Sequence, residues 1–465
     1  MGTRNGGGRR MRVAVLTTFN QLMEEYSLCT VASNEIKMLV EGGHDVTAIV
    51  NKGFKAPEES IWNHPRVKIE EIPSFTIGNE GQMPADYEKK AASLLSVLVP
   101  ILENNQICLT HDIIYQKAHR IYNLACRAAA DKINIKWLHH LHSCPIQSPK
   151  DMDFPETLEH TPFPNSWILY PNSYDIPRVA KMFGIEESDV KPVHHPIDIC
   201  EYFDFHEYTK KLVEEKDILD ADVIGCYPLR LDRGKQPEKV IKIFAELKKL
   251  GNKVRLVIAD FHSSGGDKVV FRDEMLSMLP GLSLDNMDIT FTSQLPFGAE
   301  IRAQDFVGNI KYLNKAEIGC PRKMIKDLML LSNLFILPSR TETYSLVAQE
   351  AALCKSFLVL NQDFAPMRSI YGDTPLYVQF GGNLPQSGRD FGEINTSFKP
   401  NEQTYYKDVA NWINYWLKHE KAIAMNTKIR KERNLKTVYK NELESLLYGI
   451  GGVNSEAKVL SVNAN

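Results

Sequence analysis

The chain lacks three features that would assign a protein to a specialised class. No hydrophobic run approaches the ~20 residues that a membrane-spanning helix needs, since the longest, residues 94–102, is interrupted by Ser96 and Pro100. Neither charge is in excess, because 55 Lys and Arg face 58 Asp and Glu, for a formal net charge of −3. This balance argues against coating of nucleic acid through overall charge, although it allows a local basic patch. We expect no stable membrane insertion.

The chain also lacks paired cysteines. Its eight cysteines are scattered singly, with no C-x-x-C spacing, which favours free thiols in a reducing compartment over a disulfide framework or a zinc site. The first ten residues, MGTRNGGGRR, are basic and glycine-rich, with no apolar signal-peptide stretch behind them. We therefore expect a cytoplasmic protein in which residues 1–10 and 449–465 are flexible tails.

Short β-branched runs alternate with helical patterns from residue 11 onward, which is typical of a parallel sheet covered by helices. A hydrophobic fraction of 43% over 465 residues allows two or three domains, each with its own core. The first domain is predicted at residues 11–203, with a helix at residues 28–40. Its predicted strands are residues 12–17, 45–50, 67–72, 107–110, 135–138, 166–170 and 190–193.

The same alternation restarts after a polar, charge-dense segment, residues 201–216, which we interpret as a linker. Two doubly wound, Rossmann-like α/β domains facing each other across a cleft are therefore predicted, and open sheets of this kind bind ligands at the carboxyl ends of their strands. The second domain is predicted at residues 221–403, with strands at residues 223–227, 254–259, 288–292, 334–337 and 357–360 and helices at residues 238–250, 322–331 and 346–353.

Two segments depart from this alternation. Residues 294–319 form a long connection that we interpret as a lid or acceptor loop. Residues 404–447 form a long helical stretch that carries one apolar face, made of Val409, Trp412, Ile413, Trp416 and Leu417. We expect this stretch to pack back across the domains onto the first one.

The segment PSRTETYSLVAQEAALCKSFLVLN, residues 338–361, places Glu342 in a strand-to-helix turn and Glu350 on the helix that follows. The first backbone N–H groups of a helix have no partner within the helix and attract anions such as phosphate. Carboxylates on either side would accept hydrogen bonds from vicinal hydroxyls. The alternative is a capping acid at Glu342 and a solvated Glu350. The unpartnered N–H groups at the start of this helix would be those of Thr343, Tyr344, Ser345 and Leu346.

A second segment, YPLRLDRGKQPEKVIKIFAEL at residues 227–247, places Arg230 and Lys235 in the turn after the first strand of the same domain. Arginine offers a fork to phosphate oxygens and lysine a point charge, so the two suit the concentrated charge of a diphosphate. The alternative is a pair of exposed loop cations. The joint occurrence of both segments at matching topological positions favours the phosphate site.

These segments resemble motifs of the retaining glycosyltransferase family 4, whose members have the two-domain GT-B fold. LRLDRGKQ is similar to the family's G-R-L-x-x-x-K-G, and PSRTETYSLVAQEAAL is similar to P-S-x-x-E-G-F-G-L-x-x-x-E-A-M. HHPIDICEYF, residues 194–203, is similar to P-N-G-V-D-x-x-x-F. The resemblance covers roughly residues 11–447.

The resemblance implies a nucleotide-diphosphate sugar, such as UDP-glucose or a GDP-sugar, bound mainly to the second domain. Arg230 and Lys235 would hold the diphosphate, Glu342 and the amides after it the sugar hydroxyls, and Glu350 the ribose. Two departures stand out. Thr343-Tyr344-Ser345 replaces the family's Gly-Phe-Gly, and Thr18-Phe19-Asn20-Gln21 stands where a Gly-Gly turn usually follows the first strand.

Histidines form a third group in WLHHLH, residues 137–142, where His140 and His142 share one face of a strand. The resemblance matches His142, or less closely His140, to a histidine that faces the donor sugar, where a neutral imidazole could orient it. A buried core histidine is the alternative for His142. A zinc site is a further alternative, but no accompanying Cys, Asp or Glu spacing supports it. His111 and His140 are predicted on the acceptor side, and His194 and His195 are predicted to be structural.

Two D-x-D pairs, Asp151/Asp153 and Asp220/Asp222, occur away from the positions where such a pair would hold a metal, so no metal and no other cofactor is expected. The basic stretch at residues 428–433 is interpreted as a solvated helix face, with contact to an acidic acceptor as the alternative. The sequence thus predicts a metal-free, retaining transferase of the EC 2.4 hexosyltransferase type, with His142, Glu342, Arg230 and Lys235 as catalytic residues.

The hydroxyl acceptor is predicted to be a polysaccharide, a metabolite or a hydroxymethylated base of viral DNA. Three other functions stay open at this point. A GT-B epimerase or hydrolase would act on the nucleotide sugar without an acceptor. A phosphorylase would need a lysine that carries pyridoxal phosphate, and no motif for one is visible. A non-catalytic protein would only bind the nucleotide sugar.

Overall fold

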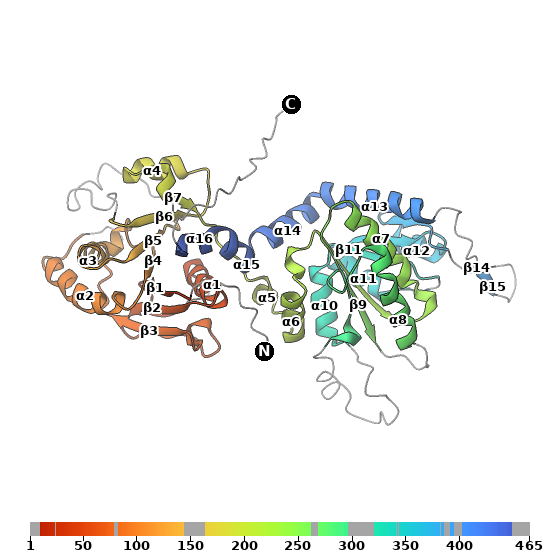
Figure 1. Ribbon diagram of the computed structural model, residues 1–465, viewed down its shortest axis with the longest axis horizontal. Helices are drawn as coiled ribbons and strands as arrows, with labels where there is room; N and C mark the ends of the chain where they lie inside the picture. Colours follow the sequence, from red (N-terminus) through yellow and green to blue (C-terminus); the bar gives the residue numbers. More distant parts are fainter. Residues whose placement is uncertain are drawn as a thin grey trace, which may run out of the picture. The chain divides into compact units, whose positions relative to one another are not determined.

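The computed structural model describes most of the chain and divides it into two compact units (Figure 1). The first unit comprises Met1–Asp198 and Arg433–Asn465, and the second comprises Ile199–Glu432. The residues described are 10–23, 25–78, 82–143, 163–261, 268–295, 320–340, 342, 344–381, 383–385, 391–394 and 402–448. The predicted tails at 1–9 and 449–465, Thr343 and most of the predicted lid at 294–319 lie outside these ranges.

The first unit is built on a seven-stranded parallel sheet with the order β3-β2-β1-β4-β5-β6-β7. Its main helices are α1 (Ser27–Glu41), α2 (Tyr87–Leu102), α3 (Arg120–Ala130) and α4 (Ile176–Phe183). The strands are β1 (Arg12–Leu16), β2 (Asp45–Asn51), β3 (Val67–Ile72), β4 (Ile107–His111), β5 (Lys136–His140), β6 (Ser166–Tyr170) and β7 (Val190–Pro192).

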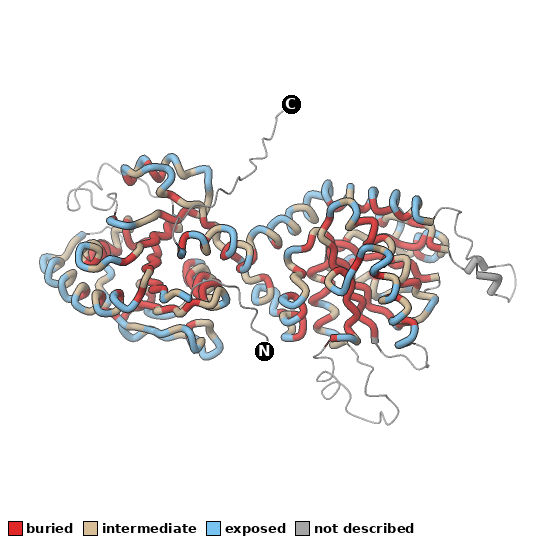
Figure 2. Tube along the Cα trace, viewed as in Figure 1, coloured by how far each residue is buried: buried red, intermediate tan, exposed pale blue. Residues whose placement is uncertain are grey.

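Alternation along the central strand β1 sends its side chains into two separate cores. Val13 and Val15 pack in the cluster that contains the buried face of α1. Ala14 and Leu16 pack in the cluster that contains the buried residues of α2 and α3. Since both faces are covered, the central strands β1 and β4 read as nearly continuous apolar runs and are buried over most of their length, whereas the edge strand β3 is partly exposed. Figure 2 shows this buried centre of the sheet in red.

The chain returns to the first unit at its C-terminal end. Residues 433–448 form α15 (Leu435–Val438), a π-helical turn (Tyr439–Leu443) and α16 (Glu444–Tyr448). Tyr439 lies against the end of α1, where its hydroxyl is 2.7 Å from Nε2 of His44. A Cβ atom on Gly42 would lie 2.4 Å from the Tyr439 ring, so glycine is required for this close approach.

The second unit is built on a six-stranded parallel sheet with the order β10-β9-β8-β11-β12-β13. The strands are β8 (Val223–Arg230), β9 (Val254–Phe261), β10 (Ile289–Phe291), β11 (Leu334–Leu337), β12 (Phe357–Asn361) and β13 (Leu376–Val378). A short antiparallel pair, β14 (Asn383–Pro385) and β15 (Phe391–Ile394), follows.

The helices of the second unit complete a doubly wound fold. They are α5 (Ile199–Tyr202), α6 (Glu207–Glu215), α7 (Pro237–Lys249), α8 (Lys268–Met278), α10 (Arg322–Leu331), α11 (Leu346–Leu353), α12 (Ala365–Tyr371), α13 (Glu402–His419) and α14 (Lys421–Glu432). The prediction of two doubly wound parallel sheets is therefore confirmed.

Three boundary predictions need correction. The segment 201–216 is not a linker, because α6 buries Tyr208 and Leu212 in the core of the second unit. The first unit accordingly ends at Asp198 instead of 203, and the second begins at Ile199 instead of 221. A single helix over 404–447 that packs on the first domain is also wrong. The apolar stripe of α13 packs against α7, so residues up to 432 belong to the second unit.

No helix among the described residues combines the length and the apolar character needed to cross a membrane.

Candidate functional site

The candidate site of the second unit lies where its strand order reverses. Strands β8 and β11 are neighbours in the sheet, and the connections after them lead away in opposite directions along it. Ligands of open α/β sheets bind outside the carboxyl ends of the strands at this point. The loop after β8 carries Lys235, and the loop after β11 carries Glu342.

Hydrogen bonds hold these two loops together. The backbone N–H of Arg340 donates to the carbonyl oxygen of Gly234 at 3.0 Å. The fully buried side chain of Gln236 donates from Nε2 to the carbonyl oxygen of Pro338. Gln236 has φ +49°, an unusual value for a residue with a Cβ, immediately before Pro237 starts α7. The buried contact of Gln236 compensates for this backbone strain and fixes the turn that presents Lys235.

Lys235 and Glu342, which are 107 residues apart in the sequence, form an ion pair between Nζ and Oε1. Their side chains are 22% and 17% exposed, so the pair is partly shielded but reachable. Arg230, at the end of β8, is far more open, with a side-chain exposure of 60%, and its Nε lies 3.3 Å from Oδ2 of Asp232. Two exposed partners at this distance interact weakly, which leaves the guanidinium available to a ligand.

The helix α11 begins at Leu346, and Ser345 occupies its N-cap position with φ +58°. The Ser345 side chain makes no capping hydrogen bond. Tyr371 fixes the entry to the helix from outside, because its hydroxyl donates to the carbonyl oxygen of Ser345 at 2.8 Å. Burial raises the pKa of Tyr371 to about 12, so the hydroxyl keeps its proton at neutral pH. Tyr344 and Leu346 flank this start and are exposed, as an anion site requires.

Glu350 is not the isolated, solvated residue of the alternative interpretation. It lies on α11 and pairs through Oε1 with Nη2 of Arg322, the first residue of α10. The Arg322 side chain is 81% exposed and that of Glu350 is 26% exposed. Arg322 was not predicted as a site residue; its only signal in the sequence is a basic residue directly after Pro321 at the start of a predicted helix.

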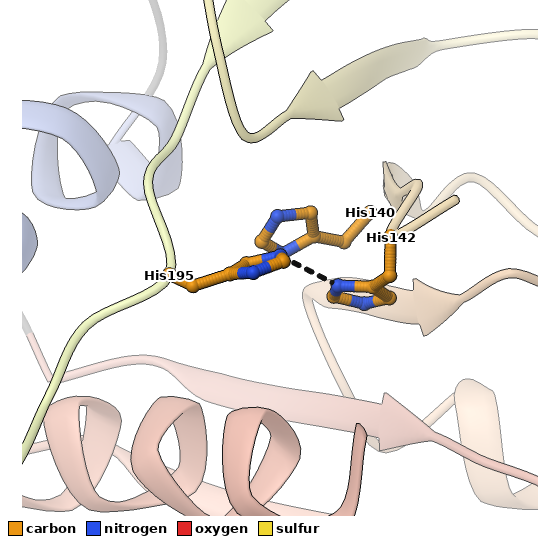
Figure 3. A group of neighbouring side chains, drawn as sticks. All are labelled: His140, His142 and His195. Carbon is orange, nitrogen blue, oxygen red and sulfur yellow. Dashed lines mark hydrogen bonds between the residues drawn. The ribbon is translucent and has the colours of Figure 1, made fainter. Parts of the chain in front are cut away.

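The first unit carries a separate cluster, in which histidines at the carboxyl ends of β4, β5 and β7 surround a buried glutamate from α1. Glu35, 1% exposed, contacts Nδ1 of His140 through Oε1 and lies 3.0 Å from Nε2 of His111 through Oε2. Nδ1 of His111 is 2.8 Å from Nε2 of His142, and Nδ1 of His142 is 2.9 Å from Nε2 of His195 (Figure 3). Four imidazoles and one carboxylate thus form a continuous network.

The electrostatics of this cluster follow from its burial. Burial alone would raise the pKa of Glu35, but the charges and hydrogen bonds of His140 and His111 hold that pKa well below the ordinary value. Burial lowers the pKa of His142 well below its ordinary value and that of His195 to about 4. Both rings are therefore neutral at physiological pH, and each offers one nitrogen lone pair.

The structure regroups the predicted histidines. It brings His140 and His142 together, as the spacing suggested, and adds His111, predicted separately on the acceptor side, and His195, predicted to be structural. It separates His139, whose Nδ1 lies 2.8 Å from Oγ1 of Thr110 and whose ring packs edge-on against Phe163 on the other face of β5. Sequence spacing gave no signal for Glu35, which precedes His140 by 105 residues.

The remaining charged motifs have structural partners. Asp222 pairs with Lys431, and Asp220 lies 2.5 Å from Lys253, at the amino end of β8 and so away from the candidate site. Arg430 in the basic stretch is buried and donates to the carbonyl oxygens of Leu219 and Ala221 at 2.6 and 2.7 Å. The stretch is therefore not a wholly solvated face, and its contact with an acidic acceptor stays a prediction. Asp151 and Asp153 lie outside the described residues.

Comparisons with known proteins give no close relative. No protein-family model matches the chain, and no curated protein matches it. Among solved structures, a glycosyltransferase from Rickettsia africae ESF-5 is 13% identical, with 94% of this chain and 97% of that chain covered and a TM-score of 0.34. Anabaena Alr3699/HepE in complex with UDP and glucose is 14% identical, with 95% and 100% covered and a TM-score of 0.33. Sucrose-phosphate synthase from Thermosynechococcus elongatus is 14% identical, with 92% and 96% covered and a TM-score of 0.32. Since these scores lie below 0.5, the arguments about this chain rest on its own sheets and side chains.

Proposed function

We propose that the chain is a glycosyltransferase of the GT-B type that moves a sugar from a nucleotide-diphosphate sugar, a UDP- or GDP-sugar, to an acceptor hydroxyl. One observation carries this proposal. At the switch point of the second unit, the two loops that the Lys235–Glu342 ion pair joins also carry the open guanidinium of Arg230 and the uncapped start of α11. Cations, a helix N-terminus and a carboxylate in one place suit a ligand that carries both phosphates and hydroxyls.

The cations would act on the leaving group. As the bond between the sugar and the diphosphate breaks, negative charge develops on the phosphate oxygens, and preorganised positive groups stabilise it. Arg230 would offer two parallel N–H donors, and Lys235 would offer a point charge. The amides of Tyr344, Ser345 and Leu346, at the start of α11, would add the partial positive charge of a helix end. In this proposal these groups supply the charge that a bound metal supplies in other transferases, so no metal is assigned to the transfer.

The ion pair between Lys235 and Glu342 suggests how the donor is accommodated. Each residue neutralises the other in the free protein. A diphosphate would take over Lys235, which would free the Glu342 oxygens to accept hydrogen bonds from sugar hydroxyls. Glu350 would accept from the ribose hydroxyls in the same way, with Arg322 as its partner in the free protein. Donor binding would therefore exchange ion pairs instead of stripping charges of their partners.

A retaining transfer needs no nucleophile from the protein in this scheme. The acceptor hydroxyl attacks the anomeric carbon from the face that the diphosphate leaves, and its proton passes to the departing phosphate oxygen. The role predicted for His142, contact with the donor sugar, remains a prediction. Because both of its ring nitrogens are occupied by His111 and His195, we assign it no proton transfer.

A donor panel tests the proposal. The purified chain is incubated with UDP- and GDP-sugars and with three acceptor classes: polysaccharides, small metabolites and duplex DNA that contains hydroxymethylated bases. Products are identified by mass spectrometry. We expect nucleotide diphosphate and one glycosylated acceptor, and both should disappear with Lys235→Ala. Conversion of the donor without an acceptor would indicate an epimerase or hydrolase, and binding without turnover would indicate a binding protein. Either result, or the absence of binding, would overturn the proposed transfer.

A further inference from the structure

We propose that His140, His142 and His195 of the first unit form a binding site for a divalent transition-metal ion of borderline softness, such as Zn²⁺. These three residues bring one ring nitrogen each to within 4.8 Å of one another. Figure 3 shows the three rings gathered in one place, from the end of β5, the loop directly after it and the segment beyond β7. This inference is independent of the sugar transfer proposed for the second unit.

The first support is that one buried ring nitrogen of His140 lacks a hydrogen-bond partner. Its side chain is fully buried, its Nδ1 contacts Glu35, and its Nε2 has no hydrogen-bond partner within the described part of the chain. A buried polar atom without a partner lowers the stability of the folded protein, because it has lost its hydrogen bonds to water and gained none in return. Most such atoms in native proteins turn out to have a partner, an unseen ion or a functional role. A metal ion would give this nitrogen the partner it lacks.

The second support is the group behind the three histidines. Histidines that bind metals usually donate their other N–H to a carboxylate or another acceptor, which fixes the orientation of the ring. Glu35 does this for His140 through Oε1, and its Oε2 lies 3.0 Å from His111. His111 in turn holds Nε2 of His142 at 2.8 Å. His140 is thus held from behind by the buried carboxylate of Glu35, and His142 is held by His111, whose Nε2 lies 3.0 Å from the same carboxylate without forming a hydrogen bond to it.

The third support is the spacing of the remaining pair. Nδ1 of His142 and Nε2 of His195 face each other at 2.9 Å. Zinc–nitrogen bonds of about 2.0–2.1 Å in tetrahedral geometry place two ligand nitrogens roughly 3.4 Å apart. The pair therefore has to open by only about half an ångström for an ion to replace the shared proton. His195 lies in a partly exposed segment outside the sheet, so it can make this adjustment.

The donor set indicates the class of metal. Imidazole nitrogens suit zinc and its neighbours in the first transition row, whereas Mg²⁺ and Ca²⁺ prefer oxygen ligands. Three protein ligands leave a fourth tetrahedral position for water or for an oxygen of a bound molecule. A zinc site was the less favoured alternative for the histidines of residues 137–142, because no Cys, Asp or Glu at a suitable spacing accompanies them in the sequence. The structure supplies the third ligand from His195, 53 residues beyond His142.

A metal titration tests the inference with the full chain. The purified protein is treated with a chelator, dialysed and titrated with Co²⁺, and the visible absorption bands of bound cobalt are recorded. We expect saturation at one equivalent per chain, and we expect Zn²⁺ to remove the bands. His195→Gln should weaken Co²⁺ binding at least about tenfold because it removes a direct ligand. Glu35→Gln should weaken it about 10–100-fold because the support behind His140 is altered.

The neighbouring His194 provides a matched control. It belongs to the same segment, but its Nδ1 lies 2.9 Å from Oε1 of Glu442, outside the cluster. His194→Gln should therefore bind one equivalent of Co²⁺ as the unaltered chain does. Circular dichroism and thermal unfolding of each variant show that it is folded. No saturable binding by the unaltered chain, equal binding by His195→Gln, or an equal loss in His194→Gln would each overturn the proposed site.

Discussion

The carboxyl edges of the two sheets carry the two clusters of the molecule, and they are built in opposite ways. In the second unit the charged groups are open, with Arg230 60% exposed and Lys235 22% exposed. In the first unit the groups are closed in, with Glu35 and His140 no more than 1% exposed. Open cations with replaceable partners suit a charged ligand that enters and leaves in each reaction cycle. A buried, mutually oriented set of imidazoles suits a resident partner. The same sheet topology thus supports two kinds of chemistry.

The largest effect is expected from removing the carboxylate of the closed cluster. Glu35→Ala leaves His111 and His140 without their common buried partner, and breaking a buried pair from one side typically costs about 3–5 kcal/mol. We expect the free energy of unfolding of the first unit to fall by that amount. Hydrogen exchange of β4 and β5 peptides during chemical denaturation measures it, with a chelator present so that bound metal adds no stability.

An exposed position on the same helix provides the control for Glu35. Thr30→Ala on α1 should change the stability by no more than about 0.5 kcal/mol, because Thr30 is exposed. If Glu35→Ala behaved like Thr30→Ala, the Glu35 network would not stabilise the first unit. The contrast between the buried cluster of the first unit and the exposed cluster of the second would then fail.

The next largest effect is expected from changing Lys235 in the exposed cluster of the second unit. Lys235→Ala should lower kcat/KM for the donor roughly 10²–10³-fold, because it removes a preorganised charge from the departing diphosphate. Thermal unfolding should change little, since the side chain is partly exposed. Arg233→Ala is the matched control in the same turn, because Arg233 pairs with Glu274 at 2.9 Å and not with Glu342. Equal losses in both variants would mean that the turn as a whole, and not the charge of Lys235, matters.

A smaller effect in the opposite direction, tighter nucleotide binding, is expected from changing Glu342, the ion-pair partner of Lys235. Glu342→Gln keeps the size of the side chain but no longer neutralises Lys235. Free UDP or GDP, which lacks the sugar, should then bind about fivefold more tightly, corresponding to about 1 kcal/mol for a partly shielded pair. Isothermal titration calorimetry measures this change, and Glu274→Gln serves as the control. Weaker binding of the free nucleotide would contradict the proposed exchange of ion pairs.

The two clusters also differ in how far their residues could be predicted from the sequence. Arg230, Lys235, Glu342 and Glu350 lie in or just after strand-to-helix turns. Hydrophobic periodicity locates such turns, and the parallel topology brings neighbouring ones together. The cluster around Glu35 could not be predicted, because it joins a helix near the start of the chain to the ends of three later strands. That juxtaposition depends on tertiary packing and leaves no local pattern.

The boundary errors have a similar origin. The segment 201–216 reads as a linker because charges dominate its composition, yet α6 needs only a narrow face, including Tyr208 and Leu212, to pack into the core. On α13, Val409, Ile413 and Leu417 of the predicted apolar face are buried, whereas Trp412 and Trp416 are 50% and 46% exposed. Amphipathicity also does not specify the surface that a helix covers. The alternation of strands and helices was predictable because the central strands, such as β1, β4, β8 and β11, are buried and are therefore nearly continuous in hydrophobicity.

The smallest expected effect separates the two members of the outermost ion pair, Arg322 and Glu350. Because the Arg322 side chain is 81% exposed, Arg322→Ala should alter stability or nucleotide affinity by no more than about 1 kcal/mol. Glu350→Gln should act selectively, because a charged acceptor holds hydroxyls more strongly than an amide does. If Glu350 holds the ribose, this variant should reduce the difference in affinity between UDP and 2′-deoxy-UDP, while Arg322→Ala preserves it. Calorimetry with both nucleotides on both variants decides between them, and an unchanged difference in Glu350→Gln would remove Glu350 from the proposed site.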